Sequence, residues 1–223
     1  MTNYRGITIS ALFGKIIEKL IQTSMDRVLL PKQSYLQFGF TKGLAPIMAS
    51  LCLTEAIAHS KERKNHLLVG TLDVQKAFDV VDHKKMKIKL HMDGLRGRNW
   101  ELVESLSNNL SETVNWRGSI SKSPYISKGV RQGAILSTSL YKLYINDLLG
   151  ALEAANVGMS IGSIYIGTPT CADDQLLIAN SVQDMQAMLN TVQDHSKNIY
   201  IASIQSKARS PRWPHLQTPS YLN

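Results

Sequence analysis

The chain has 223 residues, of which 43% are hydrophobic and 19% are charged, so it can bury a core and is not a disordered chain. Its two cysteines, Cys52 and Cys171, belong to no CxxC or His/Cys cluster, which argues against a structural zinc or a disulfide scaffold. The net charge of +8 arises in residues 1–100, which hold 16 Lys and Arg against 8 Asp and Glu. This bias favours a polyanionic partner such as nucleic acid, with ordinary solvated lysines as the alternative.

Apolar residues repeat at helical spacing in two stretches of the first sixty residues, and an unbroken apolar run, HLLVGTLD, then leads into Asp73. A short apolar run of this kind is typical of a buried strand. In chain order we therefore expect a helix over 11–30 with Ser10 as N-cap and Pro31 as its end, a helix over 44–60, a strand over 66–73, and a lysine-rich helix that begins near Val81 or Asp82.

The second half of the chain mixes short strands with longer helices. This order of elements favours an α+β fold whose sheet is covered by helices on one face. The last stretch has three prolines and no periodicity, which predicts an irregular tail. The expected elements are a helix over 99–110, paired strands over 113–118 and 123–130, a helix over 134–150, a hairpin of 161–167 with 171–179, and a helix over 181–196.

Three carboxylates stand at the ends of two apolar strands: Asp73 ends the first, and the adjacent Asp173 and Asp174 lie at or beside the turn of the later hairpin. A lone buried carboxylate loses hydration, and carboxylates that meet repel one another unless a cation lies between them. Mg²⁺ prefers oxygen ligands and binds through one or two carboxylates together with substrate phosphates. The pattern therefore predicts a metal site for phosphoryl chemistry. Helix capping by Asp73 and ordinary turn chemistry for the Asp pair are the alternatives.

Five ordered segments resemble a known family: NYRGITIS (3–10), QFGFTKG (37–43), LDVQKAFDVVDH (72–83), GVRQGAILSTSLYKLYIND (129–147) and CADD (171–174). Together, over about residues 3–207, they resemble the reverse transcriptase of a non-LTR (LINE-type) retrotransposon, in truncated form. The resemblance implies right-hand polymerase-like fingers and palm, the palm a ferredoxin-like or RRM-like antiparallel sheet covered by helices, with the thumb absent. It implies a fingers part over 1–65, a palm with finger insertions over 66–207, and an irregular tail over 208–223.

The same resemblance implies an RNA-directed DNA polymerase that uses two Mg²⁺ ions, with Mn²⁺ as a substitute, to join a dNTP to a primer 3′-hydroxyl. Its metal ligands would be Asp73, the backbone carbonyl of Val74, Asp173 and Asp174. Neighbouring residues of a strand point to opposite faces, so we expect Asp173 to be a firmer ligand than Asp174.

Other residues take roles from their places in the family's motifs. Nucleotide contacts would come from Arg5, Phe78, Gln132, Gly133 and Lys207, and template contacts from Gly39, Phe40 and Gly43. Phe78 would exclude a 2′-hydroxyl, with a core position on the strand-to-helix turn as the alternative. Three positions depart from the family's usual pattern: Cys171 replaces an aromatic residue, Thr138 replaces a proline, and Ile204 replaces an asparagine ahead of Lys207.

Three functions remain open at this point. The first is a reverse transcriptase with an RNA template, a DNA primer and dNTP as partners. The second is a catalytically weak or inactive nucleic-acid-binding remnant of such an element, which the expected lack of a thumb favours. The third is a Mg²⁺-dependent phosphohydrolase or nucleotide cyclase with a similar palm, which the five ordered motifs disfavour. Neither a signal peptide nor a transmembrane segment is predicted, and we expect an intracellular protein, with the nucleus as one candidate compartment.

Overall fold

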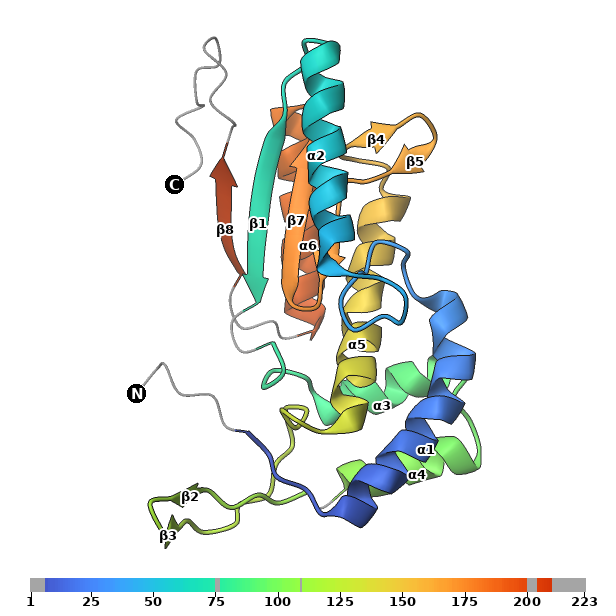
Figure 1. The fold of residues 1–223 in the computed structure, drawn as a ribbon, viewed down its shortest axis with the longest axis vertical. Coiled ribbons are helices and arrows are strands. Elements are labelled where there is room, and N and C mark those ends of the chain that lie inside the picture. The colour runs from blue at the N-terminus through green and yellow to red at the C-terminus, as the bar shows by residue number, and fades with distance from the viewer. Residues whose placement is uncertain (1–6, 75–76, 109, 200–203, 210–223) are drawn as a thin grey trace. The chain divides into compact units, whose positions relative to one another are not determined.

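A computed structural model describes residues 7–74, 77–108, 110–199 and 204–209, and for 73–74, 197–199 and 204–209 it describes the backbone alone. The chain forms two compact units (Figure 1). Unit 1 consists of residues 1–33 and 76–144, and unit 2 of residues 34–75 and 145–223. Within the described ranges, no helix has both the length and the apolar character that a membrane crossing requires.

Unit 1 is mainly helical. Its elements are α1 (Leu12–Leu29), the short 3₁₀ helix η1 (Leu30–Lys32), α3 (His83–Met92), α4 (Arg98–Ser107), the strands β2 (Asn115–Trp116) and β3 (Ser119–Ile120), and the first part of α5 (Ile135–Ala154). Each of the predicted helices is present to within a few residues. The core of unit 1 is aliphatic and includes Met25, Met86, Leu90, Leu95, Val103 and Leu140.

The starts of α1 and α3 can be compared with the helix starts that the sequence predicts. The Asp82 side chain accepts a hydrogen bond from the Lys85 backbone N–H (3.0 Å), so Asp82 caps α3, and the predicted start of this helix near Val81 or Asp82 is confirmed. The prediction of Ser10 as the cap of α1 is wrong, because the N-cap is Ala11, which makes no side-chain cap bond. Pro31 ends the α-helical part of this region, and the chain continues through the single 3₁₀ turn of η1.

The start of α5 is held by a buried carboxylate from α1. Glu18 is 1% exposed. One of its oxygens accepts from Arg131 Nη2 (2.9 Å) and the other from the Ile135 backbone N–H (2.7 Å). The negative charge thus lies where a helix N-terminus favours it, with a guanidinium beside it. This pairing joins two segments that are far apart in the sequence.

The predicted strand pair of unit 1 differs from the observed one. β2 pairs with β3, and the partner is not the segment 123–130. Arg117 and Gly118 form the two-residue turn, both with positive φ (50° and 85°), which suits the twist of a tight hairpin. The segment 123–130 instead makes isolated bridges, such as Asp82 with Lys128. The Arg117–Gly118 dipeptide is the local sequence signal for this turn.

Unit 2 contains a four-stranded sheet in the order β6-β7-β1-β8, and each neighbouring pair is antiparallel (Figure 1). The strands are β1 (Leu68–Val74), β6 (Thr170–Cys171), β7 (Asp174–Ala179) and β8 (Ile204–Arg209). The remaining elements are α2 (Pro46–Glu62), α6 (Val182–Ile199), the second part of α5, and a small hairpin of β4 (Ser160–Ile161) with β5 (Ile164–Tyr165). The predicted strand over 66–73 and helix over 181–196 are confirmed, whereas β8 extends two residues into the segment expected to be irregular.

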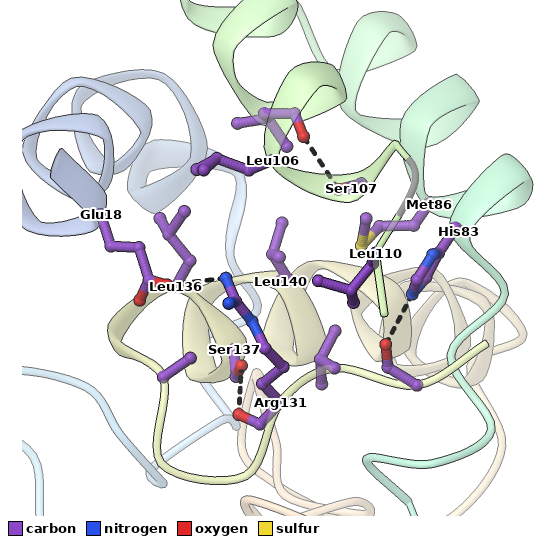
Figure 2. Close-up of a pocket in the computed structure, with 14 residues that line it drawn as sticks. Glu18, His83, Met86, Leu106, Ser107, Leu110, Arg131, Leu136, Ser137 and Leu140 are labelled. Atoms are coloured by element: carbon purple, nitrogen blue, oxygen red, sulfur yellow. Dashed lines mark hydrogen bonds and ion pairs between the residues drawn. The ribbon is translucent and has the colours of Figure 1, made fainter. Parts of the chain in front are cut away.

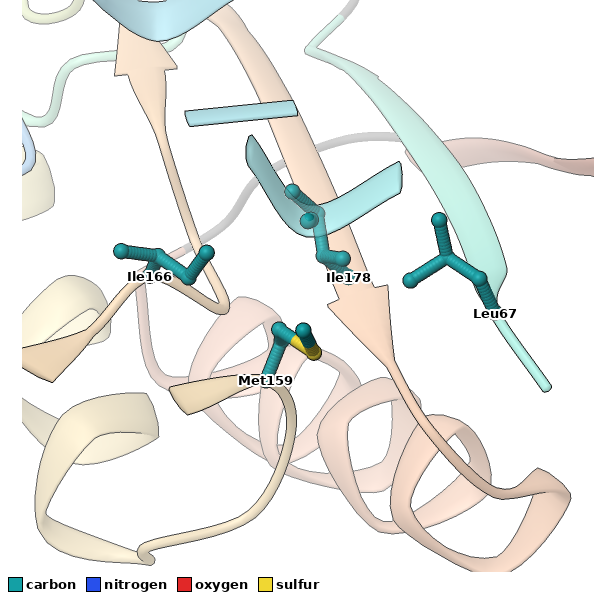
Figure 3. Close-up of a cluster of buried hydrophobic side chains, with 5 residues drawn as sticks. Leu67, Met159, Ile166 and Ile178 are labelled. Carbon is teal, nitrogen blue, oxygen red and sulfur yellow. The ribbon is translucent and has the colours of Figure 1, made fainter. Parts of the chain in front are cut away.

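Helices cover both faces of this sheet, which corrects the expectation of helices on one face only (Figure 1). Ile178 of β7 packs in a buried cluster with Ala56 of α2, together with Leu67, Met159 and Ile166 (Figure 3). On the opposite face, Gly70 lies beside Leu177 and beside Met185 of α6. Because α2 packs against the sheet, residues 34–65 group with unit 2.

Candidate functional site

The acidic pair lies on the β6–β7 hairpin. Cys171 of β6 pairs with Asp174 of β7, so residues 172–173 form a two-residue turn between them. Asp173 is therefore in the turn and is half-buried, and Asp174 is the first residue of β7 and is exposed. The expectation of a hairpin with both residues at or beside its turn is confirmed, but its first arm is the short β6 and not 161–167.

The β1–β7 register brings the Asp73 position to this hairpin. Asp73 and Asp174 are direct partners in the antiparallel ladder, although 101 positions separate them in the sequence. Residues that are paired in this way share one face of a sheet. Asp173 is expected to be the firmer metal ligand on the alternation of strand side chains, whereas Asp174 is the residue directly opposite Asp73 in the register.

The pKa of the Cys171 thiol reflects the burial and the negative charge around the hairpin. Its pKa is raised first by burial and then by the negative charges of Asp174 and Asp173. The thiol therefore lies in the field of both carboxylates, which favours a protonated sulfur and a nearby cation. Among the side chains that the structure describes, no three His, Cys, Asp or Glu gather as a metal site, and Asp73 is not among those side chains.

The turn has an unusual backbone. Ala172 has a φ of +61°, in the left-handed region that non-glycine residues seldom occupy. Such a conformation costs about 1 kcal/mol or more and persists only where the surroundings hold it. Ala172 is nearly buried, and its backbone N–H and carbonyl are both hydrogen-bonded to the Gln37 side chain.

The segment with the three predicted template residues runs along β6. Gln37 makes a parallel bridge to Thr170, the Phe38 N–H donates to the Thr170 carbonyl (2.8 Å), and the Thr170 N–H donates to the Leu36 carbonyl (2.9 Å). Gly39 is buried against the hairpin, whereas Phe40 and Gly43 are exposed. Only the last two are accessible to a template strand.

Three predicted nucleotide residues belong to unit 1. Phe78 is stacked on Tyr141, with ring centroids 5.0 Å apart, and its carbonyl accepts from the Val130 N–H (2.7 Å). Gln132 donates from Nε2 to Asp79 Oδ1 (3.4 Å), and its carbonyl accepts from the Thr8 N–H (2.8 Å). Gly133 has a φ of +101°, and a Cβ on it would lie 3.2 Å from the Thr8 carbonyl oxygen. These contacts fix the loop that precedes α5.

The remaining predicted residues are only partly visible. Arg5 lies outside the described residues. Lys207 is in β8, where its backbone pairs with Thr71, and Val74 of β1 pairs with Ile204. The structure describes the backbone alone for Val74 and Lys207, so their predicted roles remain predictions.

Unit 1 also contains a pocket, which is lined mostly by aliphatic side chains of α3, α4 and α5 (Figure 2). Its polar residues make contacts that hold the unit together. Glu18 binds Arg131, Ser137 Oγ donates to the Arg131 carbonyl (2.6 Å), and His83 Nε2 lies 2.6 Å from the Gly129 carbonyl oxygen. None of the predicted site residues lines this pocket, and we regard it as part of the packing of unit 1.

Comparison with solved structures finds the same fold. Telomerase of Candida albicans, in complex with a fragment of telomeric RNA, matches 94% of this chain and 35% of its own, with a TM-score of 0.57 and 11% identity. Apo telomerase of Candida tropicalis matches 87% of this chain and 36% of its own, with a TM-score of 0.57 and 14% identity. At these identities the likeness concerns the fold alone.

Curated relatives share more of the sequence. The Retrovirus-related Pol polyprotein from type-1 retrotransposable element R2 of Popillia japonica is 28% identical over 195 residues, which is 86% of this chain and 27% of that protein. The RNA-directed DNA polymerase from mobile element jockey of Drosophila funebris is 26% identical over 190 residues, which is 83% of this chain and 20% of that protein. The chain thus spans about a quarter or less of the length of these relatives.

A family model described as "Reverse transcriptase (RNA-dependent DNA polymerase)" matches residues 1–209. This match covers the five motifs, the strands β1 and β7 with their acidic residues, all of unit 1, and unit 2 as far as residue 209. The relatives are reverse transcriptases of non-LTR retrotransposons, so the resemblance seen in the motifs is confirmed. The chain therefore belongs to the reverse transcriptase (RNA-dependent DNA polymerase) family.

Proposed function

We propose that this chain is the fingers-and-palm part of an RNA-directed DNA polymerase from a non-LTR retrotransposon. It would extend a DNA primer with dNTP along an RNA template. The observation that carries this proposal is the β1–β7 register, which pairs Asp73 with Asp174 beside the turn that holds Asp173. In this reading the fingers part is 1–65, the palm with finger insertions is 66–207, and the tail is 208–223.

The donor set fits a divalent metal pair. Asp73, Asp173, Asp174 and the Val74 carbonyl would be the ligands, all of them the hard oxygens that Mg²⁺ and Mn²⁺ prefer. Burial first, and then the negative charges of Asp174 and Asp173, raise the pKa of the Cys171 thiol, and these two charges would favour a cation. Bound there, two such ions would activate a hydroxyl and neutralise a triphosphate.

The other residues would position the substrates. Phe78, held by its stack on Tyr141, would limit the space beside the sugar of the nucleotide. Arg5 would bind phosphate oxygens through its guanidinium, and Lys207 would hold a proton near the leaving pyrophosphate. Gln132 and Gly133, on the loop fixed by Thr8, would contact the nucleotide or the template base.

Template contacts would come from the segment after Gly39. Phe40 and Gly43 are exposed, and Phe40 offers an aromatic face on which a base can stack. Gly39 is buried, so any effect of Gly39 on the template would be indirect. For the protein in its cell we propose action on nucleic acid in the nucleus, a proposal that rests on the resemblance alone.

The direct test is Mg²⁺-dependent primer extension on an RNA template. We expect extension by the wild-type chain and a loss of at least about 100-fold in Asp173→Asn and in Asp174→Asn, because each removes charge that would offset a divalent ion. Asp194→Asn, an exposed residue of α6, is the matched control and should retain wild-type activity. A folded wild-type chain that extends no primer yet binds RNA would contradict the proposal and indicate an inactive remnant.

A further inference from the structure

The Gln37 side chain is hydrogen-bonded to the turn of the β6–β7 hairpin, which holds Asp173 and Asp174 and is called the carboxylate hairpin below. Gln37 is 1% exposed, and its Oε1 accepts from the backbone N–H of Ala172 (3.0 Å) and of Gly39 (2.9 Å). Its Nε2 donates to the Ala172 carbonyl (3.3 Å). One carboxamide therefore binds both the donor and the acceptor of Ala172, the residue that directly precedes Asp173.

The chemistry of this contact requires an amide. The two backbone N–H groups that converge on Gln37 need an acceptor, and the Ala172 carbonyl needs a donor at the same place. A carboxylate could not donate, and it would add a third negative charge close to Asp173 and Asp174. An aliphatic side chain would leave buried backbone groups of Ala172 without partners.

Gly39 lets the two segments come this close. A Cβ on Gly39 would collide with the backbone nitrogen of Ala172 and would lie 2.9 Å from the Cys171 carbonyl carbon. Beside it, Phe38 and Leu36 hydrogen-bond to Thr170 of β6. The segment 36–39 thus lies against the hairpin through backbone contacts, and Gln37 extends this contact to the turn itself.

We propose that Gln37, with Gly39, is a positioning residue for the carboxylate hairpin, holding Ala172 in its left-handed conformation so that Asp173 and Asp174 keep a fixed placement. The proposal rests on the proposed function, in which these carboxylates bind the metal ions. It also gives Gly39 a role different from template contact. The strained φ of Ala172 is the feature that would relax without the amide.

The test compares Gln37→Met with the wild-type chain. Met keeps the length and volume of the buried side chain and removes its hydrogen bonds, so the fold should persist. We expect the Ala172 amide to exchange about tenfold faster with solvent, since it loses its acceptor. We also expect Mn²⁺, titrated by electron paramagnetic resonance without nucleic acid, to bind about tenfold more weakly, because the ligands are no longer held together.

The matched control is Gln186→Met, the same change at an exposed position of α6. It should leave the Ala172 exchange and the Mn²⁺ affinity at wild-type values. Should Gln37→Met not fold, the wild-type chain alone is informative: its Ala172 amide should exchange as slowly as that of Ile178 within β7. An Ala172 amide that exchanges as fast as an open turn would overturn the proposal.

Other outcomes separate this proposal from the proposed function. If the Ala172 amide of Gln37→Met exchanges at the wild-type rate, Gln37 does not hold the turn. If that amide exchanges faster but the Mn²⁺ affinity is unchanged, Gln37 holds the turn without positioning the metal ligands. If wild type, Asp173→Asn and Asp174→Asn all bind Mn²⁺ equally, the metal site is wrong and the positioning role falls with it. In that case the exchange data still decide whether Gln37 holds the turn.

Discussion

Glu18 and Asp174 are two acidic residues of this chain that differ in burial. Glu18 is buried, and both of its oxygens accept hydrogen bonds, from Arg131 and from the start of α5. Asp174 is exposed and is paired in register with another acidic residue. A buried charge that is compensated in this way stabilises the fold, whereas two acidic residues paired in register favour a nearby cation.

Lys142 of α5 is a buried lysine whose pKa is lowered in the folded protein. It is 7% exposed, and burial lowers its pKa from 10.5, while the nearby Asp26 opposes this shift. A lysine with a lowered pKa binds fewer protons in the folded state than in the unfolded state, so stability rises with pH between its folded pKa and 10.5. In Lys142→Met we expect this rise to disappear, and stability at neutral pH to stay equal or to increase by about 1 kcal/mol.

The measurement is urea unfolding of both chains at a series of pH values from neutral to alkaline. Lys84→Met, at an exposed position of α3, is the control and should keep the pH dependence of the wild type. A Lys142→Met chain with the same alkaline rise in stability as the wild type would show that another group causes it.

At the scale of elements, the long helices match their apolar periodicity, whereas the shortest strands are too short to have one. Helices α1, α5 and α6 repeat an apolar pattern over several turns. A repeat of this length predicts a helix even where a single position breaks the pattern. Strands of two residues, such as β2, β3 and β6, have no repeat to read. Their partners were set by turns such as Arg117–Gly118 and by contacts with distant segments.

Helix caps offer a prediction at this scale. Asp82 makes the cap bond of α3, whereas Ser10, the cap that the sequence predicts for α1, makes none. We expect Asp82→Ala to lower the free energy of unfolding by about 1 kcal/mol, because the Lys85 N–H loses its acceptor. Ser10→Ala is the matched control and should change stability by less than about 0.5 kcal/mol. Chemical denaturation measures both, and equal losses would contradict the assignment of Asp82.

At the scale of the whole molecule, the distribution of charge is the main long-range feature. Residues 1–100 hold 16 basic and 8 acidic residues, but not every lysine is available to a partner. Lys87 of α3 lies 3.8 Å from Glu104 and donates to Asn108, and Lys89 pairs with Asp93 (3.1 Å). Lys84 of the same helix is exposed. The basic helix is therefore partly neutralised within unit 1.

We expect affinity for an RNA–DNA primer–template to fall by at least about tenfold when KCl rises from about 50 to about 200 mM, because binding to phosphates releases counterions. Lys84→Gln should weaken binding and reduce the salt dependence, whereas Lys87→Gln, already paired, should do so less. Fluorescence anisotropy measures both effects, and a duplex with an uncharged backbone is the control. Salt-independent binding would contradict a phosphate-based interface.

The sequence by itself determined the family, the long helices and the placement of acidic residues at strand ends. These features are local or periodic: five motifs in order, a repeat of 3.6 residues, and an apolar run that stops at Asp73. The α+β class followed from the order of elements. Departures such as Cys171 and Thr138 did not prevent the match to the family over residues 1–209.

Three features were decided only by the tertiary structure. They are the pairing of Asp73 with Asp174, the packing of α2 on the second face of the sheet, and the hydrogen bonds between Gln37 and Ala172. Each joins segments that are far apart in the chain, and neither backbone pairing nor close packing leaves a periodic trace in the sequence. A shift of one residue in the register would move Asp174 to the other face of the sheet. The sequence therefore supplied the acidic residues, and the long-range ladder paired Asp73 with Asp174 in the backbone register.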